Sequence, residues 1–149
     1  MQLDKILLFC FLTFTITTVF AQEPTGWIKL QSPTDETLRR LYFVDENNGW
    51  AVSLGGKIIN TTDAGDSWQV QNSMVTSPIV DIFFINPNRG WAITYPSEPP
   101  FGTTILTTSN GGTDWVKDSV FFENEIFSTI HFLDENVGFI GGNGIKKTT

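Results

Sequence analysis

Residues 61–68 form the most informative pattern in this 149-residue chain, Thr61-Thr62-Asp63-Ala64-Gly65-Asp66-Ser67-Trp68. The pattern has the form Ser/Thr-x-Asp-x-Gly-x-Ser/Thr-Trp. Glycine reaches the positive φ of a tight hairpin turn without steric cost. An Asp side chain can accept hydrogen bonds from backbone N–H groups of its own turn, and a Trp ring supplies a large apolar area. The pattern therefore predicts a structural turn, and its carboxylates are interpreted as turn residues and not as a catalytic pair.

A second copy of this pattern lies at residues 108–115, Thr108-Ser109-Asn110-Gly111-Gly112-Thr113-Asp114-Trp115. It has Asn110 in place of the Asp and Asp114 in place of the second hydroxyl residue. Gly26-Trp27 resembles the tail of an earlier copy. The residues to which we assign the structural role are Thr61, Asp63, Gly65, Ser67, Trp68, Thr108, Asn110, Gly112 and Trp115.

Another repeated unit precedes each copy. Segments 41–50, 82–91 and 130–139 resemble one another, each with a Phe that is followed by a turn, a Gly and an aromatic residue. A period of roughly 40 to 50 residues with several short strands per repeat is typical of propeller blades. The recurring residues are Phe43, Gly49 and Trp50, then Phe84, Gly90 and Trp91, then Phe132, Gly138 and Phe139.

Alternating apolar residues and tight Gly or Asx turns divide each repeat into four short strands. In the first repeat the predicted strands are 38–43, 50–54, 57–61 and 67–70. Antiparallel four-stranded sheets of this kind, arranged radially, make an all-β propeller. The predicted blades cover about 37–71, 78–118 and 126–149, and residues 26–31 are predicted to be an unpaired outer strand. Propellers typically have four to eight blades, so the chain is interpreted as a segment of a larger propeller or as one copy of a closed ring.

The two motifs together resemble a known repeat family. Residues 61–68, with Phe43 and Gly49-Trp50-Ala51-Val52, are similar to the bacterial neuraminidase or Asp-box repeat. The closer likeness is to the photosystem II stability/assembly factor-like repeat, and it covers the chain from about Trp27 to Thr149. The resemblance implies a β-propeller. It does not define a single activity, because similar repeats occur in sialidases, xyloglucan-cleaving enzymes, assembly factors and secreted proteins.

The first 21 residues read as a secretory signal peptide. Lys5 precedes the apolar run 6–12, and the segment ends in Val19-Phe20-Ala21, with small residues at the −3 and −1 positions. Such a segment is typical of an export signal, and its uninterrupted apolar core is shorter than the roughly 20 residues of a membrane span. We predict cleavage after Ala21, which leaves residues 22–149 as the propeller segment in a secreted, periplasmic or cell-surface protein.

Charge and composition restrict the class of partner. The chain has 9 basic and 16 acidic residues and a net charge of −7. An acidic protein with scattered basic residues is a poor ligand for phosphate backbones or anionic lipid, so neither nucleic acid nor a membrane is expected as a partner. The single Cys10 falls in the signal segment, and the single His131 aligns with the strand residue Phe83. No metal site and no cofactor are predicted.

Function is expected on the face that holds the links between blades and between the second and third strands. Loops positioned by a rigid scaffold often bind ligands, and the longer loop of the second repeat is rich in proline and aromatic residues. An alternative is a surface loop that binds nothing. The candidate ligand-binding residues are Tyr95, Glu98, Phe101, Phe121 and Phe122.

The predicted function is a secreted, non-catalytic binding or scaffolding module of a larger exported protein, with a protein or a carbohydrate as partner. Glycoside hydrolysis normally requires two placed carboxylates, and the sequence offers no complete catalytic constellation, so no catalytic residue is assigned. Two alternatives remain. The chain could be a fragment of a sialidase- or xyloglucanase-type glycoside hydrolase, or a lectin-like homo-oligomeric ring if the chain is complete.

Overall fold

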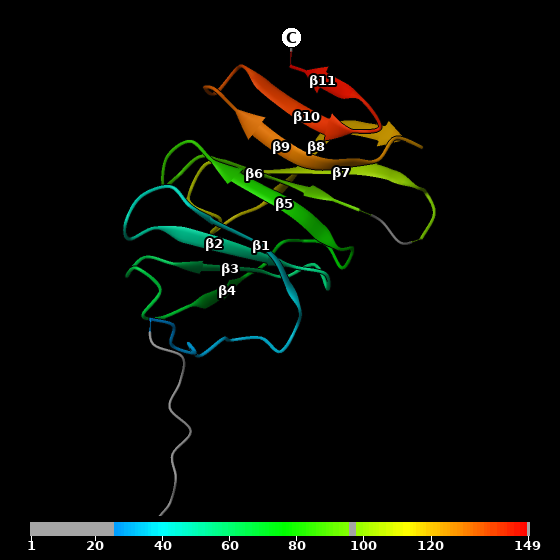
Figure 1. Cartoon of the computed structure of the whole chain (residues 1–149). Helices are drawn as coiled ribbons and strands as arrows, with labels where there is room; N and C mark the ends of the chain where they lie inside the picture. The colour runs from blue at the N-terminus through cyan, green and yellow to red at the C-terminus, as the bar shows by residue number, and fades with distance from the viewer. Residues whose placement is uncertain (1–25, 96–97, 149) are drawn as a thin grey trace, which may run out of the picture.

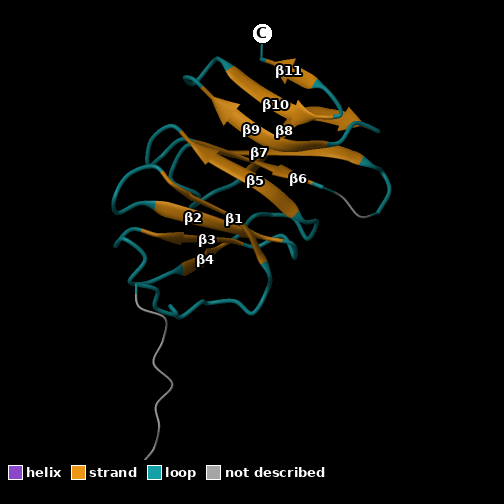
Figure 2. Ribbon diagram, viewed as in Figure 1, coloured by secondary structure: helices purple, strands orange, loops and turns teal. Residues whose placement is uncertain are grey.

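The computed structural model describes residues 26–95 and 98–148, and this part of the chain is built from strands and connecting loops (Figure 2). No helix that could cross a membrane is found in these residues. The first blade comprises β1 (Leu38–Phe43), β2 (Gly49–Ser53), β3 (Ile58–Thr61) and β4 (Gln69–Gln71). The second comprises β5 (Ile79–Phe84), β6 (Gly90–Thr94), β7 (Gly102–Thr108) and β8 (Val116–Glu123). The third comprises β9 (Phe127–Phe132), β10 (Gly138–Gly142) and β11 (Ile145–Lys147).

Strands pair with their sequence neighbours in antiparallel ladders. The sheet orders are β1-β2-β3-β4, β5-β6-β7-β8 and β11-β10-β9. Figure 1 shows the three sheets stacked face to face, with β1, β5 and β9 as successive neighbours. The predicted all-β fold of four-stranded antiparallel blades is confirmed, and the molecule is part of a propeller. The predicted signal segment 1–21 lies outside the described residues.

Segment 26–31, predicted to be an unpaired outer strand, runs as an exposed chain without strand pairing. A strand is defined by its ladder of hydrogen bonds to a neighbouring strand, and the described residues place no strand beside this segment. The predicted blade end at residue 118 is too early, because β8 continues to Glu123.

Aromatic stacks between neighbouring sheets form the core. Trp50 of blade one lies on Phe84 of blade two with ring centroids 3.6 Å apart and 10° between the planes. Trp91 of blade two lies on Phe132 of blade three in the same way, at 3.7 Å and 7°. A glycine makes room for each Phe ring, since a Cβ added at Gly90 would lie 2.5 Å from the nearest atom of Phe84. The repeated Phe, Gly and Trp positions therefore fix how successive blades pack.

Asp81 on β5 connects the inner strands of all three blades. Its side chain is only 6% exposed, and its carboxylate lies 3.0 Å from Nε of Arg40 on β1. The same carboxylate accepts a hydrogen bond of 2.9 Å from the backbone N–H of Ile130 on β9. A buried carboxylate is stable only when it is paired and hydrogen-bonded, and these two neighbouring blades supply both partners.

Candidate functional site

The Asp box of blade one is closed by its own hydrogen bonds. Thr61 Oγ1 donates to Asp63 Oδ1 at 2.6 Å and accepts from the N–H of Gly65 at 2.9 Å. Asp63 also accepts from the backbone N–H of Ser67 at 2.9 Å and from its hydroxyl at 2.6 Å. Hydrogen bonds to the charged form stabilise it, and those from Ser67 and Thr61 lower the pKa of Asp63 to about 2. The acceptor capacity of this carboxylate is used within the turn.

The Asp box of blade two is also closed by its own hydrogen bonds. The direction of one side-chain bond is reversed, because the residue at the position of Asp63 donates it instead of accepting it. Asn110 Nδ2 donates to Asp114 Oδ2 at 2.8 Å, and Asn110 Oδ1 accepts from the N–H of Asp114 at 2.9 Å. Thr108 Oγ1 donates to Asn110 Oδ1 at 3.0 Å and accepts from the N–H of Gly112 at 2.9 Å. The two departures from the pattern in this copy therefore compensate each other.

Each Asp box also docks onto the first turn of its own blade. The N–H of Ala64 donates to the carbonyl of Asn47 at 3.0 Å, and the N–H of Gly111 donates to the carbonyl of Asn88 at 2.9 Å. This contact gathers the boxes and the first turns on one face of the propeller. Loops between the second and third strands and the links between blades lie on the opposite face, as the bond of 2.8 Å from Tyr95 N–H to the Pro78 carbonyl shows.

On that opposite face lies a cavity of about 320 Å³, which we call the loop pocket. It is bounded by the link between blades one and two, by the 98–100 loop and by the facing side of β7 and β8. Its lining residues are Val75, Thr76, Ser77, Thr94, Glu98, Pro99, Pro100, Thr104, Lys117 and Phe121.

The structure brings together two of the five candidate ligand-binding residues, Glu98 and Phe121, in the loop pocket. Tyr95 and Phe101 are partly exposed, at 42% and 48%, but they do not line it. Phe122 points to blade three, where its ring meets Phe127 edge-on at 5.3 Å. Strand alternation explains this difference, because neighbouring residues of β8 face opposite sides of the sheet.

Sequence reasoning missed Thr94, Thr104 and Lys117, which line the pocket from strand positions. Their signal is the period-two alternation of β6, β7 and β8, which places them on the side of the sheet that Phe121 occupies. Glu98 is the one carboxylate and Lys117 the one cation among the lining residues of this pocket. In the described part of the chain no group of three or more His, Cys, Asp or Glu side chains is arranged to hold a metal ion. The loop pocket is therefore a surface with an apolar wall, hydroxyl groups and one charged side chain of each sign.

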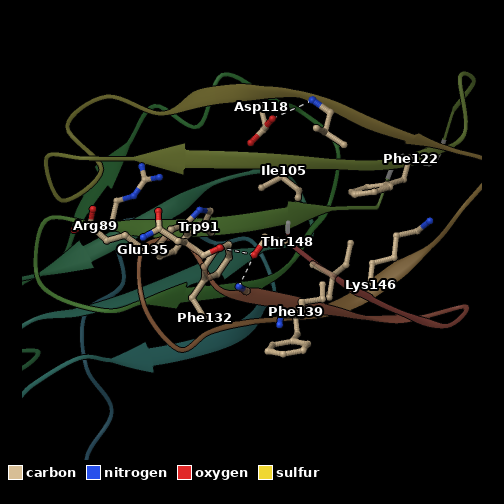
Figure 3. Close-up of a pocket in the computed structure, with 15 residues that line it drawn as sticks. Arg89, Trp91, Ile105, Asp118, Phe122, Phe132, Glu135, Phe139, Lys146 and Thr148 are labelled. Atoms are coloured by element: carbon tan, nitrogen blue, oxygen red, sulfur yellow. Dashed lines mark hydrogen bonds between the residues drawn. The ribbon is translucent and has the colours of Figure 1, made fainter.

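A larger cavity of about 460 Å³ lies between blades two and three, and we call it the blade-edge groove (Figure 3). The stacked rings of Trp91 and Phe132 form part of its wall, and charged side chains surround them. The guanidinium of Arg89 lies 4.6 Å from the Trp91 ring, a cation–π contact. Its other labelled residues in Figure 3 are Ile105, Asp118, Phe122, Glu135, Phe139, Lys146 and Thr148.

Of the five candidate ligand-binding residues predicted from the sequence, only Phe122 lines the blade-edge groove. It is formed by residues of β6, β7, β8, β9, β10 and β11 with the turns next to them, so its residues are spread over most of repeats two and three. Only the packing of one blade on the next makes them neighbours.

Comparison with known proteins agrees with this architecture. No family model matches the chain. It is 28% identical over 67 residues to the photosystem II assembly protein Ycf48 of Thermosynechococcus vestitus, and the match covers 45% of this chain and 19% of that protein. The chain spans less than half the length of this protein and of the solved structures to which it is similar.

Solved propellers superpose well on this chain. A structure of YCF48 bound to a D1 peptide has a TM-score of 0.64 at 24% identity and covers 81% of this chain and 38% of its own. YCF48 from Cyanidioschyzon merolae gives a TM-score of 0.67 at 19% identity, over 82% of this chain and 40% of that one. An ancestral GH74 enzyme gives 0.58 at 18% identity, over 74% and 17%. The resemblance to photosystem II assembly factor-like propellers, stated from the motifs, is confirmed.

Proposed function

We propose that this chain is an exported, non-catalytic propeller module that binds an extended segment of a protein partner in the loop pocket. The observation that supports this most is the composition of the pocket. Pro99, Pro100 and Phe121 offer an apolar wall, while the partly exposed Thr104 offers a hydroxyl group for a peptide backbone. Small pockets with apolar walls and a few polar groups typically fix a ligand by orientation and shape.

Two further observations support a protein partner. Glu98 and Lys117 can recognise charges of either sign on a peptide, and such pairs determine specificity more than affinity. A propeller of similar fold, YCF48, has been solved with a bound D1 peptide. A glycoside hydrolase would need a second carboxylate beside Glu98 in this pocket, and its lining residues supply none.

The binding proposal is tested by screening the full chain against an array of immobilised peptides and then substituting Phe121→Ala and Lys117→Ala. The matched control is Val116→Ala, which removes an exposed side chain from the same strand outside both cavities. Removal of a central aromatic anchor costs about 2 kcal/mol or more of binding free energy. We therefore expect at least tenfold weaker binding for Phe121→Ala and unchanged binding for the control. Equal binding by all three variants would contradict the loop pocket as the site.

Export is a separate part of the proposal and rests on the sequence of residues 1–21. Expression of the full chain in a bacterial host, followed by N-terminal sequencing of the exported product, measures it. We expect Gln22 as the first residue. A protein that stays in the cytoplasm with Met1 intact would contradict export while leaving the peptide-binding proposal open to its own test.

A further inference from the structure

The loop pocket lies at a position where blade one holds a carboxylate. In blade one, Oε2 of Glu36 accepts a hydrogen bond of 2.5 Å from Oγ of Ser53, and its Oε1 lies 3.2 Å from Nζ of Lys57. The hydrogen bond from Ser53, together with the contacts with Lys57, lowers the pKa of Glu36 and outweighs the opposite effect of partial burial. These partners therefore stabilise the charged form of the carboxyl group.

Hydrogen bonds from the backbone identify the counterparts of Ser53 and Lys57 in blade two. The N–H of Lys57 donates to Oγ of Ser53 at 2.8 Å. One blade later, the N–H of Thr104 donates to Oγ1 of Thr94 at 3.3 Å. Ser53 and Thr94 are both buried, and each ends the second strand of its blade. Thr94 and Thr104 are therefore the equivalent pair.

The counterpart of Glu36 is Ser77. The carbonyl of the residue after Glu36 accepts a hydrogen bond of 3.1 Å from the N–H of Leu54. The carbonyl of the residue after Ser77 accepts one of 2.8 Å from the N–H of Tyr95 in the same way. A serine side chain is shorter than a glutamate side chain and carries no charge, so blade two lacks a carboxylate of its own at this position.

Blade three has the carboxylate again. Glu125 stands at the position of Ser77, since the carbonyl of the residue after it accepts from the N–H of Asn143 at 2.9 Å. Its Oε2 lies 2.8 Å from Nζ of Lys146. Among the three blades that the structure describes, two thus hold a Glu that is paired with a Lys, and blade two has a serine in its place.

The loop pocket keeps the surroundings of the absent carboxylate. Ser77, Thr94 and Thr104 all line it. Thr94 is buried and supports the backbone of Thr104, whereas Ser77 and Thr104 are partly exposed and can donate their hydroxyl groups to a ligand. The two sheets that border the pocket have four strands each, so the pocket does not depend on the three-stranded blade.

Lys117 supplies a cation to the loop pocket. The residue is exposed, and within residues 26–95 and 98–148 it forms no salt bridge. Hydrogen bonds between an ammonium group and a carboxylate are charge-assisted and stronger than those between neutral groups. A carboxylate ligand therefore finds here the two kinds of donor that Glu36 has in blade one, a hydroxyl group and a lysine.

We propose that the loop pocket binds a carboxylate of the partner segment at the place that Glu36 occupies in blade one. The carboxylate accepts hydrogen bonds from Nζ of Lys117 and from the hydroxyl groups of Ser77 and Thr104. An apolar neighbour in the bound segment packs on Phe121. The partner segment is thus an acidic peptide. This inference rests on the proposed function, because it assigns the chemistry of the segment that the same pocket binds.

Glu98 limits the strength of this preference. It is an exposed carboxylate among the lining residues, and like charges that face each other across a binding surface disfavour the complex. Removal of its charge should therefore tighten the binding of an acidic peptide without affecting that of a neutral peptide.

Binding of short synthetic peptides to the full chain, measured by fluorescence polarisation, tests the proposal. The peptides have acetylated and amidated ends, so that only their side chains carry charge. We expect peptides with a Glu next to an apolar residue to bind roughly tenfold tighter than the same peptides with Gln, the usual advantage of a charge-assisted hydrogen bond. Lys117→Gln should abolish this preference. Lys29→Gln is the matched control, because Lys29 is exposed and lines none of the cavities described above.

Two further variants make the test specific. Glu98→Gln should tighten the binding of Glu peptides by about two- to fivefold, as expected for the loss of an exposed like charge. Ser77→Glu installs a carboxylate at the position it has in blade one and should weaken the binding of Glu peptides roughly tenfold or more. Its matched control is Ser77→Gln, which has the same size without the charge and should keep the preference for Glu over Gln. A Ser77→Glu variant that is folded, by its thermal midpoint, and keeps the full preference would contradict the assigned place.

The outcomes separate this inference from the proposed function. If Glu and Gln peptides bind equally and Phe121→Ala weakens both, the peptide-binding proposal stands and the carboxylate inference is overturned. If none of the peptides binds, both are overturned. A preference that appears only when the peptides carry a free C-terminal carboxylate supports the inference and assigns the group to the end of a chain.

Discussion

The interface between blades one and two and the interface between blades two and three have the same centre but different margins. In both, a Trp lies flat on a Phe at 3.6 to 3.7 Å. At the first interface the Asp box of blade two covers the stack, with Trp115 edge-on to Phe84 and Trp50 bonded to Gly111. At the second, residues 26–95 and 98–148 contain no third Asp box, and the blade-edge groove occupies this margin.

This difference separates two roles of the repeat. The Phe, Gly and Trp positions stack one blade on the next at both interfaces. The Asp box of blade two links the outer strands of blades one and two, through the bond from Trp115 Nε1 to Gln71 Oε1.

The largest effect is expected from removing the stacked tryptophan. Trp50→Ala should destabilise the fold by about 3–5 kcal/mol, the usual range for a buried Trp. Trp91→Ala should cost about 1 kcal/mol less, because Trp91 lacks the bond to an Asp-box carbonyl. Denaturant unfolding of both variants measures the difference. A larger loss for Trp91→Ala would contradict the view that the covered interface is the stronger one.

A smaller effect is expected at the glycines beneath the Phe rings. An added Cβ would lie 2.5 Å from Phe84 at Gly90 and 2.4 Å from Phe132 at Gly138. The clashes are similar, but Phe84 is enclosed by Trp50 and Trp115 whereas Phe132 borders the groove. Gly90→Ala should therefore cost about 1–3 kcal/mol, as overpacking typically does, and Gly138→Ala less. Thermal unfolding compares them, and equal losses would mean that the groove gives Phe132 no room to shift.

The smallest effect concerns acid stability and compares the two Asp boxes. The pKa of Asp63 is lowered from 3.8 to about 2 by the bonds from Ser67 and Thr61, while Asn110 in blade two does not titrate. A group whose pKa is lower in the folded state stabilises it above the unfolded pKa. The contribution is present above about pH 4 and is lost as the pH falls towards 2.

Asp63→Asn should therefore flatten the dependence of the melting temperature on pH between about 2 and 4. Asp66→Asn serves as control in the same turn, since the turn hydrogen bonds given above use Asp63 and not the Asp66 side chain. An unchanged slope in Asp63→Asn, or an equal change in the control, would contradict a role for this carboxylate in acid stability.

Most of the fold was predictable because the same pattern of strand and turn residues recurs in each repeat. The observed β1 matches the predicted strand 38–43, and the other strands of blade one begin or end within two residues of their predicted bounds. The sequence could not predict which strand, if any, segment 26–31 pairs with, because pairing depends on a neighbour that the local sequence does not contain. Phe122 was misplaced for a related reason. Its loop position suggested exposure, whereas the extension of β8 turns it towards Phe127.

The loop pocket could be predicted in part from local sequence, whereas the blade-edge groove could not. Glu98 and Phe121 could be named from the sequence, since a proline-rich loop and its neighbouring strand are visible as local features. The blade-edge groove depends on Trp91, Asp118 and Phe132 becoming neighbours across two sheets. Alignment of the repeats would have found it, because Asp118 falls at the position of Gln71 and Thr148 at the position of Thr61.

Hydrogen–deuterium exchange of the full chain tests most directly whether the two interfaces share a centre and differ at their margins. We expect the amides of β2 and β6, which carry the stacked tryptophans, to be equally well protected, and those of β11 to exchange faster than those of the equivalent β3. Equal exchange in β3 and β11, or rapid exchange in β6, would contradict this difference.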